Sequence, residues 1–167
     1  MNADMQRAVV RTRSTSARRR GQLVAQDVER LPGHLIRVAQ QAHKRMWASV
    51  VSTEITSPQY GILNAILAYP GIDQKTAGEE VGIDKSTVGD VVDRLVGKRL
   101  VRAFRDPDDQ RRNLLYLSEA GQDSLAELAP RVLEMNRRLM AALDESEQEV
   151  LVGLLKRVVE SLPENGS

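Results

Sequence analysis

The fold is decided by residues 73–118, DQKTAGEEVGIDKSTVGDVVDRLVGKRLVRAFRDPDDQRRNLLYLS. Two short helical patterns meet at Gly82, and a strand, a charged turn and a second strand follow them. Asp73 and Asp84 stand where the two helices would begin, because an aspartate side chain can accept hydrogen bonds from the first backbone N–H groups of a helix. The stretch therefore predicts two helices joined by a tight turn, followed by a β-hairpin.

The second of these helices has the spacing of a helix that is buried on one side only. Its apolar positions recur at i, i+3, i+4 and i+7, which places them on one face; they are Val88, Val91, Val92 and Leu95. The polar residues of its first turn, and a cation two turns further on, are Lys85, Ser86, Thr87 and Arg94. A helix of this kind fits the major groove of DNA, which is about 12 Å wide, with its first turn directed at the bases. The alternative is an ordinary helical hairpin with solvated polar ends.

The hairpin favours the DNA-binding interpretation. Residues 100–105 alternate apolar and basic side chains, as a half-buried strand does, and residues 106–110 have turn composition. Arg105, Arg111 and Arg112 flank the turn, and a guanidinium group can enter the narrow minor groove. Residues 98–117 carry a net charge of +3, whereas residues 118–167 carry −5. The positive charge therefore lies where a polyanion can bind.

Long amphipathic helices are expected on both sides of this stretch. The first begins near Leu31, with Pro32 in its first turn, and its apolar stripe is Leu35, Ala39, Ala42, Met46 and Val50. The next starts within residues 56–59, TSPQ, and ends at residues 69–71. Either Thr56 caps this helix together with Gln59, or Ser57 caps it with Pro58 at the first helical position.

Two further helices follow the hairpin. Ser118 can cap the first of them, whose apolar seam is Leu125, Leu128, Val132, Met135, Leu139 and Ala142. Asp144 and Glu147 form a capping box for the second, whose apolar residues are Val150, Leu151, Leu154, Leu155, Val158, Val159 and Leu162. This second stripe is broad enough to cover its own subunit and a partner. A monomeric helix bundle is the alternative.

Residues 1–25 lack helical apolar periodicity, and residues 1–22 carry a net charge of +5. They are interpreted as a disordered basic arm. The arm can contact DNA through Arg18, Arg19 and Arg20, or it can be a solvated tail.

The composition excludes several functional classes. The chain has no cysteine, so it has no disulfide, thiolate metal site or cysteine nucleophile. His34 and His43 would lie about 180° apart on a helix and are a poor metal pair. No glycine-rich phosphate loop, catalytic carboxylate pair or zinc motif is present, so we expect no enzyme activity and no cofactor. The chain lacks an apolar run of membrane-spanning length or a secretion signal, and a cytoplasmic location without membrane contact is expected.

Together these features resemble the MarR family of bacterial winged-helix transcriptional regulators. The motif that carries the resemblance consists of Asp109-x-Arg111, then Leu117-Ser118 after five residues, then Glu119-x-Gly121. Residues 84–109 are similar to the family's recognition helix and first wing strand, and the resemblance extends over about residues 31–162. It implies a mainly α fold with a small β-wing, in which a winged helix-turn-helix DNA-binding lobe is joined to a helical dimerisation domain. The implied boundaries are 1–25 for the arm, 57–118 for the DNA-binding domain, and 26–56 with 119–165 for the dimerisation domain.

The resemblance also implies roles for single residues. Arg111 would be the wing arginine that enters the minor groove, and Asp109 the carboxylate that orients it. Ser118 stands where the family usually has threonine, which is a conservative change for a helix cap. Gly89 and Asp90 occupy the middle of the recognition helix, where many relatives carry larger polar or basic residues. Base contacts are therefore expected from the first turn of this helix instead.

By the same resemblance, the chain would be a homodimer that represses transcription and leaves double-stranded DNA when it binds a small aromatic carboxylate or its CoA thioester. The candidate ligand residues are His34, Arg37, Trp47 and Tyr60, which offer cations, an aromatic surface and a hydroxyl. Packing or solvent exposure is the alternative for each of them. A ligand-independent DNA-binding regulator and a winged helix that binds protein are the alternatives for the whole chain.

Overall fold

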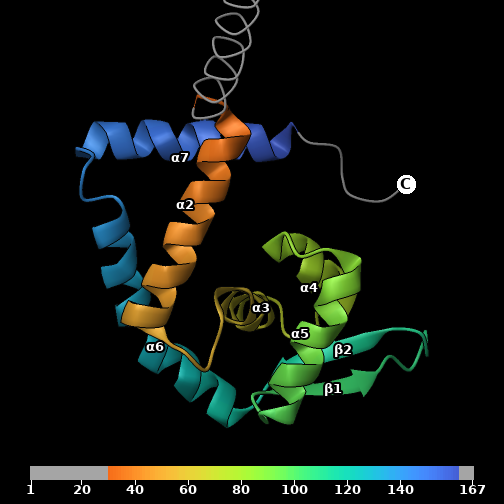
Figure 1. The fold of residues 1–167 in the computed structure, drawn as a ribbon. Helices are drawn as coiled ribbons and strands as arrows, with labels where there is room; N and C mark the ends of the chain where they lie inside the picture. The colour runs from red at the N-terminus through yellow and green to blue at the C-terminus, as the bar shows by residue number, and fades with distance from the viewer. Residues whose placement is uncertain (1–29, 162–167) are drawn as a thin grey trace, which may run out of the picture. The chain divides into compact units, whose positions relative to one another are not determined.

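The computed structural model describes residues 30–161, and the contacts divide the chain into two units, the first ending at His43 and the second beginning at Lys44. The described chain is mainly helical with one two-stranded antiparallel sheet, as the sequence predicts (Figure 1). Its elements are α2 (Pro32–Met46), the π-helix η1 (Trp47–Val51), α3 (Ser57–Ala68), α4 (Gln74–Val81), α5 (Lys85–Gly97), β1 (Val101–Arg105), β2 (Asn113–Leu117), α6 (Glu119–Leu139) and α7 (Glu145–Glu160). The predicted arm, residues 1–25, lies outside the described residues. Within residues 30–161, no helix is long and apolar enough to cross a lipid bilayer.

Side-chain caps begin α3 and α4, and a glycine ends α4. Thr56 and Gln59 form a capping box at the start of α3, so the first of the two predicted alternatives is correct. The Asp73 carboxylate accepts from the backbone N–H groups of Lys75 and Thr76 at the start of α4. Gly82 ends α4 in the left-handed conformation, with φ of +70°, which a residue with a Cβ rarely adopts. These local signals fix the tight turn between α4 and α5.

The core lies where α3, α4, α5, η1 and α6 meet the sheet. Its most deeply buried large side chains are Ile62, Leu63, Ile66, Val92, Leu95, Leu115 and Met135. Burying a side chain of this size contributes roughly 1.5–3 kcal/mol relative to leaving it exposed. The predicted buried face of α5 is confirmed, because all four of its apolar positions belong to this core.

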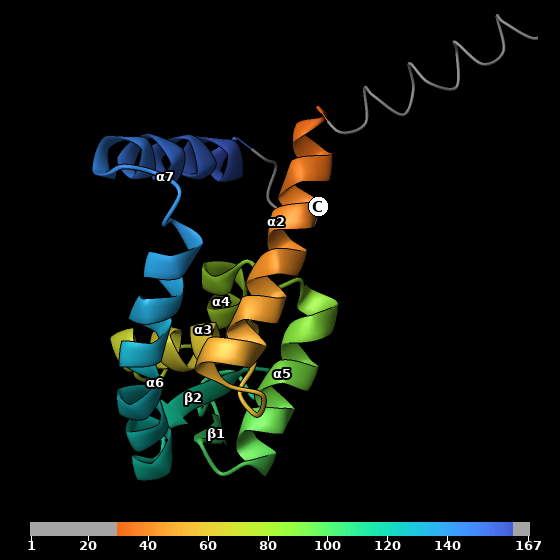
Figure 2. The same cartoon turned by 60° about the vertical axis from the view of Figure 1, so that its left-hand side comes forward.

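The hairpin pairs β1 with β2 in an antiparallel register that sets Val101 opposite Leu117 and Arg105 opposite Asn113. Figure 2 shows the strands between α5 and the first turns of α6. The expected half-buried alternation of β1 is wrong, because only Val101 is buried and Phe104 is 54% exposed. Helices α3, α4 and α6 pack against β2, whereas α5 packs against β1, the outer strand.

Two of the predicted long helices end differently in the structure: the first one, and the one that Ser118 caps. The first helix changes to π-geometry at Trp47, where the Ser52 N–H donates to the Trp47 carbonyl oxygen over 3.1 Å. A single wide turn leaves no mark on the apolar spacing, so the sequence did not show it. Helix α6 ends at Leu139, and the predicted seam residue Ala142 therefore lies beyond it.

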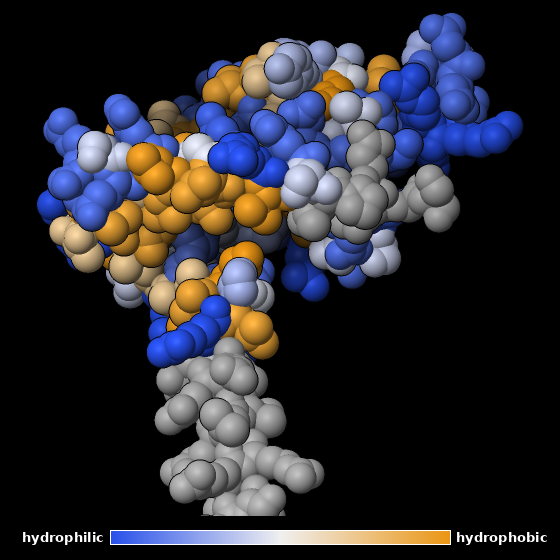
Figure 3. All heavy atoms as spheres, turned by 90° about the horizontal axis from the view of Figure 1, so that it is seen from above, coloured by the Kyte–Doolittle hydropathy of each residue, from blue (hydrophilic) through white to orange (hydrophobic). Residues whose placement is uncertain are grey.

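Large apolar side chains are exposed along both α2 and α7. In the first unit these are Leu35, Ile36 and Val38, which follow the exposed Leu31. In the second unit, α7 contains no buried residue, and its exposed apolar residues are Val150, Val152, Leu154, Leu155, Val158 and Val159. Figure 3 shows apolar side chains gathered on the face of the molecule that α7 occupies. An exposed apolar stripe of this extent is typical of an interaction surface.

Candidate nucleic-acid interface

The first turn of α5 is exposed and held by its own cap. Lys85, Ser86 and Thr87 are all exposed, while the opposite face of the helix is buried. The Thr87 N–H donates to Asp84 Oδ1 over 3.1 Å, and the hydroxyl groups of Ser86 and Thr87 donate to the same carboxylate. The hydroxyl of Ser86, followed by that of Thr87, lowers the pKa of Asp84 from its ordinary value. The cap is therefore ionised at neutral pH and fixes the two hydroxyl groups.

The middle of α5 faces Gln74 at Gly89. A Cβ at this position would lie 3.5 Å from Nε2 of Gln74, at the start of α4. Gln74 also approaches the second strand, because Asn113 Nδ2 lies 3.5 Å from Gln74 Oε1. The next residue, Asp90, is exposed, as is Arg94 one turn further on. Gln74 is a polar neighbour of α5 that the sequence did not suggest, because it lies 15 residues before Gly89.

The wing turn is braced by short-range hydrogen bonds. The buried Asp106 carboxylate accepts from the Asp108 N–H over 2.9 Å, and Arg105 Nη1 donates to the Gln110 carbonyl oxygen over 3.1 Å. The Arg111 N–H donates to Asp109 Oδ1 over 3.0 Å. Asp109 thus holds the backbone of Arg111. Arg111 is itself an exposed residue of the turn.

Arg112 is placed differently from Arg111. Its Nη2 lies 3.0 Å from Asp73 Oδ2, and its Nη1 lies 3.8 Å from Asp106 Oδ2. Burial alone would raise the pKa of Asp73, but hydrogen bonds from Thr76 and Arg112 outweigh it and hold that pKa below its ordinary value. No local pattern in the sequence indicates this contact, because Asp73 and Arg112 are separated by 39 positions.

The four candidate ligand residues form two local pairs. In the first unit, His34 Nδ1 lies 3.4 Å from Arg37 Nη2, one turn along α2. In the second unit, the rings of Trp47 and Tyr60 lie 5.5 Å apart at an interplanar angle of 57°. Trp47 is buried, and its indole N–H donates to the Ile55 carbonyl oxygen over 2.7 Å. The Trp47 ring is therefore part of the core, while Tyr60 is partly exposed.

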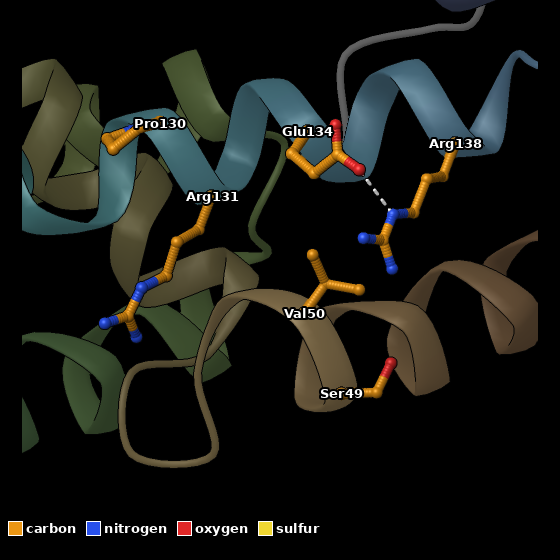
Figure 4. Close-up of a pocket in the computed structure, with 6 residues that line it drawn as sticks. All are labelled: Ser49, Val50, Pro130, Arg131, Glu134 and Arg138. Carbon is orange, nitrogen blue, oxygen red and sulfur yellow. Dashed lines mark hydrogen bonds and ion pairs between the residues drawn. The ribbon is translucent and has the colours of Figure 1, made fainter.

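A depression between η1 and α6 is lined by Ser49, Val50, Pro130, Arg131, Glu134 and Arg138 (Figure 4). Both of its guanidinium groups are paired with glutamates. Arg131 Nη2 lies 2.9 Å from Glu127 Oε1, and Arg138 Nε lies 2.6 Å from Glu134 Oε1. The glutamates offset the positive charge of both arginines, so this depression attracts an acid less strongly than a site lined by cations without carboxylate partners.

Comparison with known proteins gives one family. A sequence model described as "MarR family" matches residues 53–112, which span α3, α4, α5, β1 and the wing turn. A putative transcriptional regulatory protein for the hcr operon of Thauera aromatica is 31% identical over 126 residues, which cover 75% of this chain and 76% of that protein.

Solved structures agree with this result. The PcaV transcriptional regulator from Streptomyces coelicolor, in complex with its natural ligand, is 47% identical with a TM-score of 0.75, and the match covers 78% of this chain and 92% of PcaV. BpsR from Bordetella bronchiseptica, whose DNA binding is regulated by 6-hydroxynicotinic acid, is 26% identical with a TM-score of 0.71, covering 76% and 97%. A mutant of MarR from E. coli, complexed with operator DNA, is 28% identical with a TM-score of 0.71, covering 81% and 96%.

Proposed function

The chain belongs to the MarR family of transcriptional regulators, and we propose that it is a homodimeric repressor that binds a pseudo-palindromic DNA operator. The proposal is carried by the exposed first turn of α5 together with a braced, basic wing that leaves Arg111 exposed. Residues 57–118 would form the DNA-binding lobe, and residues 26–56 and 119–165 the dimerisation domain.

In this proposal α5 enters the major groove. Lys85, Ser86 and Thr87 would approach the bases, and Arg94 would approach a backbone phosphate. Arg111 would enter the minor groove beside the α5 site, with Asp109 holding its backbone. Nothing tests DNA contacts by Arg105 and Arg112, which stay predictions. Both guanidinium groups bind groups of the chain itself, and these bonds would compete with a DNA phosphate.

The exposed apolar faces support the homodimer. Six large apolar side chains of α7 are exposed to water, and their burial against a second copy would be favourable. A two-fold dimer would place two copies of α5 about one helical turn of DNA, ~10 bp, apart. The operator would then have two inverted half-sites at that spacing.

A labelled DNA duplex from the region flanking the protein's own gene tests DNA binding by fluorescence anisotropy at several salt concentrations. Arg111→Ala should weaken binding by about 1–3 kcal/mol if Arg111 makes a specific contact. Arg102→Ala, which removes the same charge from β1, is the control and should weaken binding less. Unchanged affinity and an unchanged salt slope for Arg111→Ala would contradict the wing assignment, and salt-insensitive association would favour a protein-binding winged helix.

We further propose that a small aromatic carboxylate or its CoA thioester releases the protein from DNA. The regulation of BpsR by 6-hydroxynicotinic acid supports this chemistry. His34 and Arg37 would attract the acid, and Tyr60 would contribute a hydroxyl and a partly exposed ring. Trp47 would support the Tyr60 ring from the core.

Thermal-shift measurements with aromatic carboxylates and their CoA thioesters test the effector class. An effector should raise the Tm of the wild-type protein, and Arg37→Ala should reduce that rise. Arg45→Ala, which removes another exposed cation of α2, should leave the rise unchanged. If no compound in either class raises the Tm, the effector proposal is wrong and a ligand-independent regulator is favoured.

A further inference from the structure

Arg112 lies between two carboxylates that belong to different parts of the DNA-binding lobe. Asp73 starts α4, and Asp106 follows β1 at the beginning of the wing turn. The side chains of Asp73 and Asp106 are only 13% and 12% exposed, whereas that of Arg112 is 50% exposed. One guanidinium group therefore serves two carboxylates that are largely withdrawn from water.

Both carboxylates are also fixed within their own segments. Asp73 Oδ1 accepts from the Lys75 N–H over 3.0 Å, and Asp73 Oδ2 accepts from the Thr76 hydroxyl over 2.6 Å. Asp106 Oδ1 accepts from the Asp108 N–H. Because each carboxylate is anchored separately, Arg112 joins two fixed points, and a DNA phosphate would have to compete with both of them for its guanidinium group.

The backbone of Arg112 is held as well. Its N–H donates to the Asp109 carbonyl oxygen over 2.9 Å, and its carbonyl oxygen accepts from the Asp106 N–H over 3.0 Å. The preceding residue, Arg111, donates its own N–H to Asp109. With the main chain and the Arg112 side chain both fixed, the direction in which Arg111 leaves the turn is restricted.

From this geometry we infer that Arg112 is a positioning residue: it clamps the wing to the first turn of α4 and so directs Arg111, rather than binding DNA itself. The inference rests on the proposed function for its consequence in DNA binding, while the clamp itself can be measured without DNA. The clamp requires an arginine at position 112 together with an acidic cap at position 73.

The first experiment measures the clamp in the absence of DNA. The Tm is determined for the wild type, Arg112→Ala, Asp73→Ser and the double variant. Serine keeps a helix cap at position 73 but removes the carboxylate, so the loss of the ion pair is separated from the loss of the cap. Arg112→Ala should lower the Tm by about 2–4 °C in the wild type and by less in the Asp73→Ser background. Equal effects in both backgrounds would overturn the clamp, whether or not the protein binds DNA.

The second experiment measures DNA affinity with the labelled duplex used for Arg111→Ala. Arg112→Ala should weaken binding about three- to tenfold in the wild type but much less in the Arg111→Ala background, because it acts through Arg111. In the Arg111→Ala background, Arg112→Ala should leave the salt slope unchanged, whereas loss of a direct phosphate contact would lower it by about one. Arg102→Ala is the control for the change in charge.

The outcomes separate the two proposals. If Arg112→Ala weakens binding equally in both backgrounds and lowers the salt slope, Arg112 is a direct phosphate contact and the positioning role is wrong. If the wild type does not bind the duplex while the Tm effects are coupled, the clamp exists, but the proposed function and the directing of Arg111 are both contradicted.

Discussion

Gly121 lies where α6 passes close to the backbone of Leu100. A Cβ at position 121 would overlap the Leu100 carbonyl oxygen, a backbone atom that cannot move away easily. We expect Gly121→Ala to reduce the free energy of unfolding by about 1–3 kcal/mol, as overpacking does. Urea unfolding followed by circular dichroism measures this change. Gly97→Ala is the matched control, because a Cβ at that position meets nothing within 4 Å; equal stabilities of the two variants would contradict the close approach.

Arg99 follows the C-cap of α5, Lys98, and adopts the left-handed conformation that usually selects glycine. Its φ is +60°, its N–H donates to the Val96 carbonyl oxygen, and the Leu100 N–H donates to the Leu95 carbonyl oxygen. This pair of hydrogen bonds is the Schellman motif, in which a side chain at the left-handed position is strained. Arg99→Gly should therefore increase the free energy of unfolding by about 0.5–1 kcal/mol, and Arg99→Val should decrease it. Chemical denaturation of both variants tests the sign, and a destabilised glycine variant would show that the Arg99 side chain outweighs the strain.

At the scale of elements, the sequence predicted the helix caps and the buried face of α5, because both depend on residues that are close together in the chain. The caps at Asp73, Asp84 and Ser118 are confirmed, because each side chain binds a backbone N–H two or three positions away. Apolar spacing identified the buried face of α5 in the same way. The π-turn at Trp47 and the Arg112 contact with Asp73 could not be predicted, because one leaves the spacing unchanged and the other joins distant positions.

Helix α6 carries an ion-pair cluster that gives a pH dependence. Hydrogen bonds from Arg137 and then Arg138 lower the pKa of Glu134 to about 2. Since the folded pKa lies below the ordinary value of 4.5, the contribution of Glu134 is present above about pH 4.5 and is lost as the pH falls towards 2. We expect Glu134→Gln to lower the Tm at pH 7 and to match the wild type near pH 2.

Thermal unfolding from pH 2 to pH 7 at low salt tests this expectation. Added salt should reduce the difference between the wild type and Glu134→Gln, because the cluster is solvent-exposed. A constant difference in Tm across this pH range would mean that Glu134 acts through packing instead of charge.

At the scale of the whole molecule, the described structure leaves the apolar residues of α7 largely exposed. No residue of α7 is buried, and Val159 is 68% exposed. If a second copy covers this face, as proposed, a charge placed there would be buried on association and would oppose it. The monomer has a mass of 18.6 kDa, so the wild type should sediment as a species of about 37 kDa.

Val159→Glu should shift sedimentation towards the monomer, by at least a tenfold loss of dimer affinity, about 1.4 kcal/mol. Ser146→Glu is the matched control: it adds the same charge to α7 at an exposed position in the first turn, outside the apolar stripe, and should remain dimeric. Circular dichroism establishes that both variants are folded before they are compared. A folded dimeric Val159→Glu would exclude this face of α7 from the interface. A monomeric wild type would contradict the homodimer, and with it the prediction of two inverted half-sites in the operator.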